Sequence, residues 1–331
     1  MSIIEEELSR FRKDVAEHVP GSEVVCCVRS SVQVRLRRTD FKTLVVQAQF
    51  PADYPAGRIV VELKSKTIPT KFLDGLVSAC DAETKKLLGQ KQLLPVVKFV
   101  RAFMDENPLM ACSDELSHIR KDLVRPSDEI KVNRKAGTIV MRVVEGNYAT
   151  QFKLIVPDNY PADPVKMELK TSSLPSEFQV YMAGQSEELA RQCVQPPLRP
   201  KPRAPPFTPA PSLRRVATFL VMECARVYPM TCCPLCKARC FPDDPARIVE
   251  DLEDAQHIER ILCNHLYHRK CLDDYMKTPP FKGGKKCKAK GCEQRIFHER
   301  WNVSEKLAED RWAHQEAKRR EIDEVVEFLG V

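Results

Sequence analysis

Four side chains of types that bind metal ions lie close together in residues 263–271, CNHLYHRKC. One residue separates Cys263 from His265, and two separate His268 from Cys271. Thiolate and imidazole are the usual ligands of zinc, which takes four ligands in a tetrahedron, often as two pairs on tight turns. The segment therefore raises the question of whether these four side chains bind one ion or whether each pair is completed from elsewhere.

Two further cysteine pairs lie on either side of this segment. Cys233 and Cys236, in CPLC, come 26 residues before it, and Cys287 and Cys292, in CKAKGC, come 15 residues after it. Eight ligands predict two zinc ions with four protein ligands each, which leaves no open position for a hydrolytic water. Because the region has little apolar sequence, we expect the metal to supply most of its folding free energy, about 10 kcal/mol per ion.

The last pair is less regular than the others. Four residues lie between its cysteines, and no proline precedes the second one. Cys232, Cys240 or His298 could therefore replace one of its ligands.

Cysteine usage and composition indicate a reduced, intracellular protein. Eight of the 14 cysteines fall within residues 232–292, and the others are scattered through apolar runs, as buried thiols are. The first ten residues, MSIIEEELSR, are acidic, unlike a secretory signal, and no segment approaches eighteen uncharged apolar residues. We expect a protein of the cytoplasm, the nucleus or both, with no membrane partner.

The chain before this cysteine cluster repeats itself. Residues 50–72, FPADYPAGRIVVELKSKTIPTKF, align without gaps to residues 156–178, VPDNYPADPVKMELKTSSLPSEF, at an offset of 106, and nine of the 23 pairs are identical. Two copies are too few and too long for a solenoid, so each copy is predicted to be a small domain.

Hydrophobic periodicity predicts an α+β fold for each copy. In the first copy, four short runs rich in β-branched residues predict strands after an amphipathic helix, and two helical patterns follow Pro69 and Pro95. In the second copy, a helix near Ser113 and three strand patterns precede helices after Pro175 and Pro211. The predicted strands are EVVCCVRS, VQVRLRR, TLVVQAQF and RIVVELKS in the first copy, and GTIVMRVVEG, ATQFKLIV and VKMELKTS in the second.

A proline-rich stretch interrupts the second copy. Residues 195–211 contain eight prolines in 17 positions. Its position predicts a projecting loop of ten inserted residues between two helices rather than a linker between domains. This prediction pairs Pro95, Val100 and Phe103 with Pro211, Val216 and Phe219, at an offset of 116.

The repeated unit resembles the RWD domain, which combines a helix, four strands with a YPxxxP-like sequence before the last, and two helices. Residues 159–165, NYPADPV, keep that pattern, whereas residues 53–59, DYPAGRI, have Arg58 in place of the second proline. The resemblance implies a fold like that of ubiquitin-conjugating enzymes without their catalytic cysteine, and hence a role in binding partners. Cys80, which lies 26 residues after Tyr54, is expected to be a buried structural thiol.

The order of the eight ligands resembles a RING finger with histidines at the fourth and fifth ligand positions. The resemblance implies a cross-brace, in which the first and third pairs share one ion and the second and fourth pairs share the other. It also implies that Leu235 and Tyr275 contact a charged ubiquitin-conjugating enzyme. The basic residue that often follows the last cysteine is replaced by Glu293, and Arg295 could take its role.

The remaining segments are charged. Residues 304–329 are predicted to form a helix whose apolar points, Leu307, Ile322, Val325, Val326 and Leu329, pack on the zinc region or on a partner. Five lysines between residues 282 and 290 and the net charge of +7 permit nucleic-acid contact, but no aromatic residues alternate with them, which favours a solvated loop.

These patterns divide the chain into four parts. They are two RWD-like domains at 1–107 and 113–229, the second containing the insertion at 195–211, a RING-type zinc finger at 230–300 and a charged helix at 301–331. This layout resembles that of RWD–RING ubiquitin ligases. The resemblance implies that the chain recruits a conjugating enzyme through the zinc finger and a substrate or partner through the RWD-like domains. The alternatives are a non-catalytic adaptor subunit and a zinc-dependent binder of nucleic acid.

Overall fold

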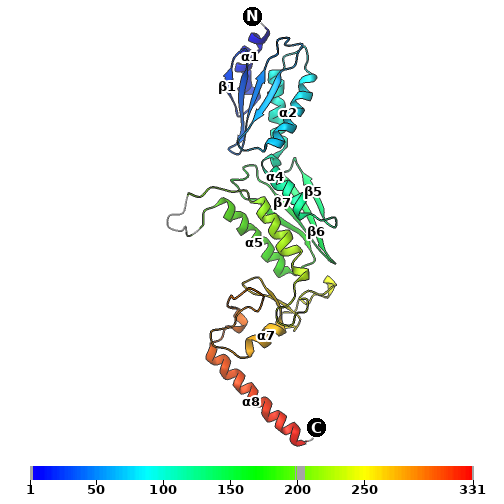
Figure 1. The fold of residues 1–331 in the computed structure, drawn as a ribbon, viewed down its shortest axis with the longest axis vertical. Coiled ribbons are helices and arrows are strands. Elements are labelled where there is room, and N and C mark those ends of the chain that lie inside the picture. The colour runs from blue at the N-terminus through cyan, green and yellow to red at the C-terminus, as the bar shows by residue number, and fades with distance from the viewer. Residues whose placement is uncertain (1–2, 198, 200–205, 330–331) are drawn as a thin grey trace. The chain divides into compact units, whose positions relative to one another are not determined.

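The structure, a computed structural model, describes residues 3–197, 199 and 206–329 (Figure 1). It is a mixed α+β protein with two four-stranded antiparallel sheets and one two-stranded sheet among the described residues. The chain divides into two compact units. The first contains residues 1–143, 149–172 and 176–224, and the second contains residues 144–148, 173–175 and 225–331.

The first repeat is a sheet with one helix before it and two after it. All four predicted strands are present, and they pair in chain order. The elements are α1 (Ile3–His18), β1 (Ser22–Cys27), β2 (Val32–Thr39), β3 (Lys42–Gln49), β4 (Val60–Lys64), α2 (Thr70–Lys85) and α3 (Leu93–Glu106).

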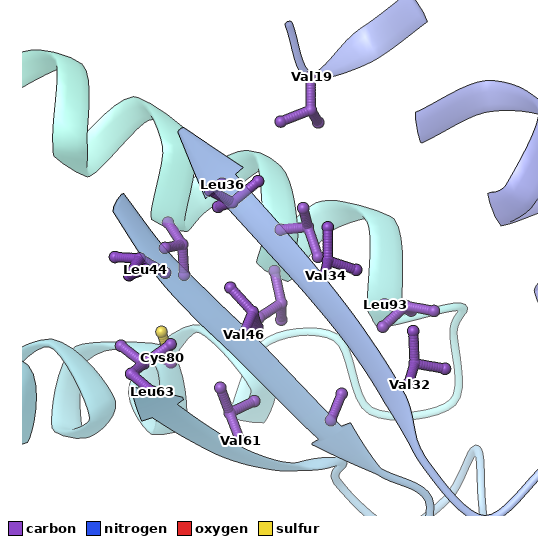
Figure 2. Packing of buried hydrophobic residues seen from close by; sticks show 14 of the residues in the cluster. Val19, Val32, Val34, Leu36, Leu44, Val46, Val61, Leu63, Cys80 and Leu93 are labelled. Atoms are coloured by element: carbon purple, nitrogen blue, oxygen red, sulfur yellow. The ribbon is translucent and has the colours of Figure 1, made fainter. Parts of the chain in front are cut away.

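The core of this repeat lies between the sheet and its helices. Val32, Val34 and Leu36 alternate along β2 with more exposed residues, so the pleat turns all three to one face. That face meets buried residues of the helices, including Cys80 and Leu93, as Figure 2 shows. Alternating sequence thus gives the sheet one apolar face, and its burial stabilises the repeat.

The second repeat has the same order of elements with a shorter first helix. They are η1 (Pro108–Cys112), α4 (Ser113–His118), η2 (Ile119–Leu123), β5 (Glu129–Asn133), β6 (Thr138–Glu145), β7 (Tyr148–Ile155), β8 (Lys166–Ser172), α5 (Ser176–Val194), α6 (Leu213–Thr218) and η3 (Phe219–Ala225). Strand β5 was not predicted. Its sequence, EIKVN, has only Ile130 and Val132 as apolar residues, and both are only half-buried.

A buried polar network begins the last helix of the first repeat. Glu7 accepts hydrogen bonds from the hydroxyl of Tyr54 and from the backbone N–H of Leu93, at 2.9 Å in the second case. The Tyr54 hydroxyl in turn accepts from the N–H of Gln92 at 3.0 Å. The side chain of Gln92, the N-cap residue, does not cap α3. Glu7 of α1 therefore supplies an acceptor that the first turn of this helix needs.

The second repeat contains a similar network, in which each backbone N–H donor lies one position further into the helix. Glu115 accepts from the Tyr160 hydroxyl at 2.6 Å and from the N–H of Arg214 at 2.8 Å, and the N–H of Leu213 donates to Tyr160 at 3.0 Å. The networks pair Tyr54 with Tyr160 at the offset of 106, as predicted. The N-cap residues Gln92 and Ser212, whose side chains accept from the N–H groups of Ile59 and Val165, correspond at an offset of 120. The predicted offset of 116 is therefore wrong by four residues, because Pro95 lies inside α3 whereas Pro211 precedes α6.

The proline-rich insertion is consequently longer than predicted. Offsets of 106 before it and 120 after it, between the N-cap residues Gln92 and Ser212, give 14 inserted residues rather than ten. Part of this stretch, residues 198 and 200–205, lies outside the described residues.

The buried carboxyl of Glu115 should make the stability of the second repeat depend on pH. Burial raises the pKa of this carboxyl above 4.5, against the opposing effect of its hydrogen bond from Tyr160. The folded state therefore holds a proton more tightly than the unfolded state, and ionisation at higher pH costs stability. We expect Glu115→Gln, which cannot ionise, to become more stable relative to the parent as pH rises above 4.5. Urea unfolding from pH 4 to pH 8 measures this, and a pH-independent difference would contradict it.

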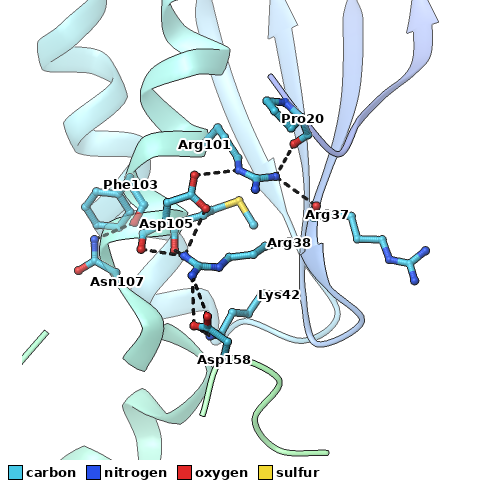
Figure 3. A network of polar contacts seen from close by, with 10 residues as sticks. Pro20, Arg37, Arg38, Lys42, Arg101, Phe103, Asp105, Asn107 and Asp158 are labelled. Carbon is cyan, nitrogen blue, oxygen red and sulfur yellow. Dashed lines mark hydrogen bonds and ion pairs between the residues drawn. The ribbon is translucent and has the colours of Figure 1, made fainter. Parts of the chain in front are cut away.

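A charged cluster connects the two repeats within the first unit (Figure 3). Arg38 donates to both carboxylate oxygens of Asp158, at 3.1 and 3.2 Å, and to the carbonyl of Asp105 at 2.7 Å. The fully buried ammonium of Lys42 lies 3.7 Å from Asp158, and desolvation lowers its pKa. Since Arg38 and Lys42 belong to the first repeat and Asp158 to the second, these contacts hold the repeats against each other.

The second unit contains little regular structure apart from its helices. Its strands β9 (Ile258–Arg260) and β10 (Leu266–His268) form an antiparallel pair, and α7 (Arg269–Lys277) follows directly. The other elements are η4 (Tyr228–Met230), η5 (Pro245–Arg247), η6 (Glu299–Trp301) and α8 (Glu305–Leu329). The helix predicted at 304–329 is thus present.

Candidate metal centre

The structure brings the eight predicted ligands together in two groups. Within each group, one ligand atom of every residue lies within 4.8 Å of the others, so each group could hold a metal ion. Adjacent pairs of the opening segment fall into different groups. The first group is Cys233, Cys236, His268 and Cys271, and the second is Cys263, His265, Cys287 and Cys292.

Tight turns present the ligands of each pair. In the first pair, the N–H of Lys237 donates to the carbonyl of Cys233 at 2.9 Å, and Lys237 has a φ of 66°. Asn264, between the ligands Cys263 and His265, has a φ of 65°, and Gly291, before Cys292, has a φ of 77°. Left-handed backbone is unfavourable for a residue such as lysine, so the surrounding structure must hold the turn at Lys237 in place, whereas asparagine and glycine adopt this conformation more readily.

The β9–β10 hairpin and α7 position the third pair. His268 ends β10 and Cys271 lies in the first turn of α7, so the strand-to-helix turn brings both side chains to one point. His268 Nδ1 lies 3.3 Å from the Cys236 sulfur and 3.9 Å from the Cys271 sulfur. Its Nε2 lies 3.0 Å from the carbonyl oxygen of Arg239, which fixes Nδ1 as the nitrogen that faces the cysteines.

The second group is supported by a tyrosine. His265 Nδ1 lies 3.2 Å from the Cys263 sulfur and 3.5 Å from the Cys287 sulfur. The fully buried Tyr267 places its hydroxyl 3.1 Å from the Cys287 sulfur, and this hydroxyl accepts from the N–H of Lys288 at 3.0 Å. Tyr267 thus orients a ligand and connects it to the backbone that follows.

Electrostatics favour a cation at the first group. Burial raises the pKa of the Cys233 thiol, but hydrogen bonds from His268 and from nearby backbone N–H groups outweigh it and lower the pKa to about 6. Hydrogen bonds with Cys233 and Cys236 raise the pKa of His268 to about 9. Burial and the neighbouring thiolates raise the pKa of Cys271 to about 12. A bound cation would replace the proton on His268 and let all three sulfurs ionise.

The three alternative ligands lie outside both groups. Cys232 is exposed, and Cys240 is buried beside the first group with its pKa raised by that burial. His298 Nε2 lies 3.3 Å from a carboxylate oxygen of Glu259, and its ring packs on Trp301. Cys287 and Cys292 are therefore the residues that complete the second group.

The three residues predicted to contact a partner differ in exposure. Leu235 is half-buried between the ligands Cys233 and Cys236. Tyr275 is also half-buried; its hydroxyl donates to the carbonyl of Lys286 at 3.0 Å, and the Lys285 ammonium lies 4.6 Å from its ring centre. The exposed Arg295 lies 3.7 Å from Glu305 and packs over a neighbouring aromatic ring.

Cys80 has no features of a nucleophile. The side chain is fully buried in the first repeat, and burial raises its pKa to about 12. At neutral pH the reactive thiolate is therefore a negligible fraction of the population. We expect iodoacetamide to leave Cys80 unmodified in the native protein and to modify it in urea, as peptide mass spectrometry would measure. Rapid native modification would contradict this account, and the exposed Cys232 provides the positive control.

Sequence reasoning did not identify Tyr267 or the carbonyl of Arg239 as parts of the centre. Tyr267 lies between the two histidines on the short strand β10, whose three residues are all buried, so no alternation of polar and apolar residues indicated its position. The role of a backbone carbonyl depends on the fold, and no residue type signals it.

Comparisons with known proteins add no relative. Neither a scan against models of protein families nor a search of curated proteins finds a match to this sequence. Among the described residues, no helix is both long and apolar enough to span a membrane.

Proposed function

We propose that each group binds one zinc ion. Three cysteines and one histidine form a donor set that suits zinc in a tetrahedral structural site. Four protein ligands close the coordination sphere, so the ions would supply folding free energy rather than activate a water molecule. Tyr267 and the Arg239 carbonyl would then orient two of the ligands.

We further propose that the chain is a RING-type ubiquitin-protein ligase. The observation that carries this proposal is the interleaving of the two groups, in which the first pair joins the third and the second joins the fourth. The β9–β10 hairpin carries the second pair at its turn, and α7, which begins inside the third pair, precedes the fourth. This arrangement agrees with the cross-brace that the ligand spacing implies.

In this proposal the chain forms no covalent intermediate with ubiquitin. Leu235 would contact a charged conjugating enzyme, and Tyr275 would contribute through the part of its ring that is exposed. The two repeats, as RWD-like domains, would bind the substrate or a partner. The buried Cys80 agrees with a binding role for the first repeat rather than a catalytic one. Reduced cysteines are consistent with action in the cytoplasm or nucleus.

A non-catalytic adaptor is the second candidate, and Arg295 favours it. This side chain is the nearest basic group after the last ligand, yet it is paired with Glu305 and packed on an aromatic ring. A residue held in this way is less available to contact ubiquitin.

Self-ubiquitination of the zinc-loaded protein distinguishes the two candidates. The parent is assayed with ubiquitin, activating enzyme and a panel of conjugating enzymes, beside Leu235→Ala and Cys233→Ser, with zinc measured on each. A ligase is expected to be active, and Leu235→Ala to remove activity while two zinc ions remain. Absence of activity across the panel with two ions bound would favour the adaptor.

A further inference from the structure

A groove in the first unit has an apolar floor and a basic rim. Its volume is about 420 Å³, and it is lined by α2, by the end of α3, by η1 and α4, and by the end of β5. The rings of Phe72 and Phe103, 5.8 Å apart, and the side chain of Leu116 are only half-buried in it. We call it the junction groove, because the two repeats contribute to it.

Exposed basic side chains surround this floor. Lys71, Arg120 and Arg134 line the groove, and Asp114 is the acidic residue among its lining. Three positive charges against one negative charge favour an occupant that carries acidic residues beside an apolar surface.

Gly75 leaves space in the middle of the groove. This residue lies on α2, and a Cβ atom added to it would meet nothing within 4 Å. Because Gly75 lines the groove and has room for a Cβ atom, it is a suitable position for a blocking substitution.

The C-terminal end of α8 carries the complementary surface. Ile322, Val325, Val326 and Leu329 have the i, i+3, i+4, i+7 spacing of one helical face, and all four are exposed, Leu329 to 64%. At 100° per residue, Glu321 and Asp323 flank this face on its two sides. Of the two expected contacts of this stripe, the zinc region and a partner, the structure does not show the first, because Leu307 and all four of these residues are exposed. The half-buried residues of α8 are Ala308, Trp312 and Glu316.

We infer that the apolar face at the end of α8 of one molecule docks in the junction groove of a second copy of this chain. The contact places four aliphatic side chains on the aromatic floor and the flanking acidic residues near the basic rim. It is a heterologous contact, since it joins two different surfaces, and it does not depend on the proposed ligase activity.

Two blocking variants test the inference in the full-length, zinc-loaded protein. Gly75→Leu closes the groove and leaves the helix intact, whereas Val326→Glu disrupts the helix face and leaves the groove intact. Gly184→Leu is the matched control for the first variant, because Gly184 also lies on a helix with nothing within 4 Å of an added Cβ atom.

Sedimentation velocity over a concentration series is the measurement. We expect the parent and Gly184→Leu to self-associate, increasingly so at low salt, and each blocking variant alone to remain monomeric. An equimolar mixture of the two blocking variants should form a 1:1 dimer, because one intact groove and one intact helix face remain. A monomeric parent at every concentration would overturn the inference, and so would association that the blocking variants leave unchanged or a mixture that stays monomeric.

Discussion

Removal of the two proposed zinc ions is expected to unfold the region between residues 232 and 292 while the first unit stays folded. Structural zinc supplies on the order of 10 kcal/mol of folding free energy per ion, and this region has few buried apolar side chains that could replace it. The first unit contains neither group of ligands and has its own apolar core.

The two tryptophans make the effect easy to follow. Trp301 is 9% exposed and donates a hydrogen bond from Nε1 to Asp273 of α7 at 2.8 Å, so its fluorescence reports the packing of that helix. Both tryptophans lie in the second unit. A chelator should shift tryptophan emission to longer wavelength and leave most of the far-ultraviolet circular dichroism unchanged.

Two neighbouring cysteines provide the matched variants. Cys236→Ser removes a ligand and is expected to lower the bound zinc to one ion or fewer, whereas Cys232→Ser, at an exposed position outside both groups, should keep two. Loss of zinc without any change in tryptophan emission would contradict a structural role for the metal.

Replacement of Glu7 by alanine is expected to destabilise the first unit by about 3 kcal/mol or more. The carboxylate is 3% exposed and accepts two hydrogen bonds, and bonds to a charged group contribute about 1.5–3 kcal/mol each. The substitution also leaves the N–H of Leu93 without its acceptor at the start of α3. Urea unfolding followed by circular dichroism measures the change, since tryptophan emission is insensitive to this unit.

The adjacent Glu6 is the control for this prediction. Glu6 forms an exposed ion pair with Lys91, at 2.7 Å, so Glu6→Ala should cost much less stability than Glu7→Ala. Equal unfolding midpoints for Glu6→Ala and Glu7→Ala would show that the buried network does not support the repeat.

The sequence predicted most strands of the repeats because each is a short alternating run with one face in a core. Strand β5 was not predicted, because it lies at a sheet edge and its apolar side chains are only half-buried. Burial selects less strongly for apolar residues at such an edge. Residue identity at a constant offset revealed the repeat only over residues 50–72 and 156–178. After the insertion, the residues that correspond in the two repeats can be identified only from buried hydrogen bonds. Gln92 and Ser212 make the same contact, since each side chain accepts from a backbone N–H, but their side chains are different.

The two groups of candidate metal ligands could be predicted for a different reason. Cysteine and histidine at fixed short spacing identify ligand pairs, because the turn that holds two ligands is local. Which pairs share an ion is a property of the fold, and only the resemblance to a known arrangement suggested it. The apolar stripe of α8 was also visible in the sequence, but whether a neighbouring element covers it depends on tertiary packing.

The most direct test of the ligase proposal is a single-turnover assay, in which zinc-loaded protein discharges ubiquitin from a pre-charged conjugating enzyme onto free lysine. We predict that the parent accelerates discharge at least tenfold over the conjugating enzyme alone, and that Leu235→Ala abolishes the acceleration while two zinc ions remain bound. No acceleration with any conjugating enzyme, by a protein with two zinc ions, would contradict the proposal that this chain is a RING-type ligase.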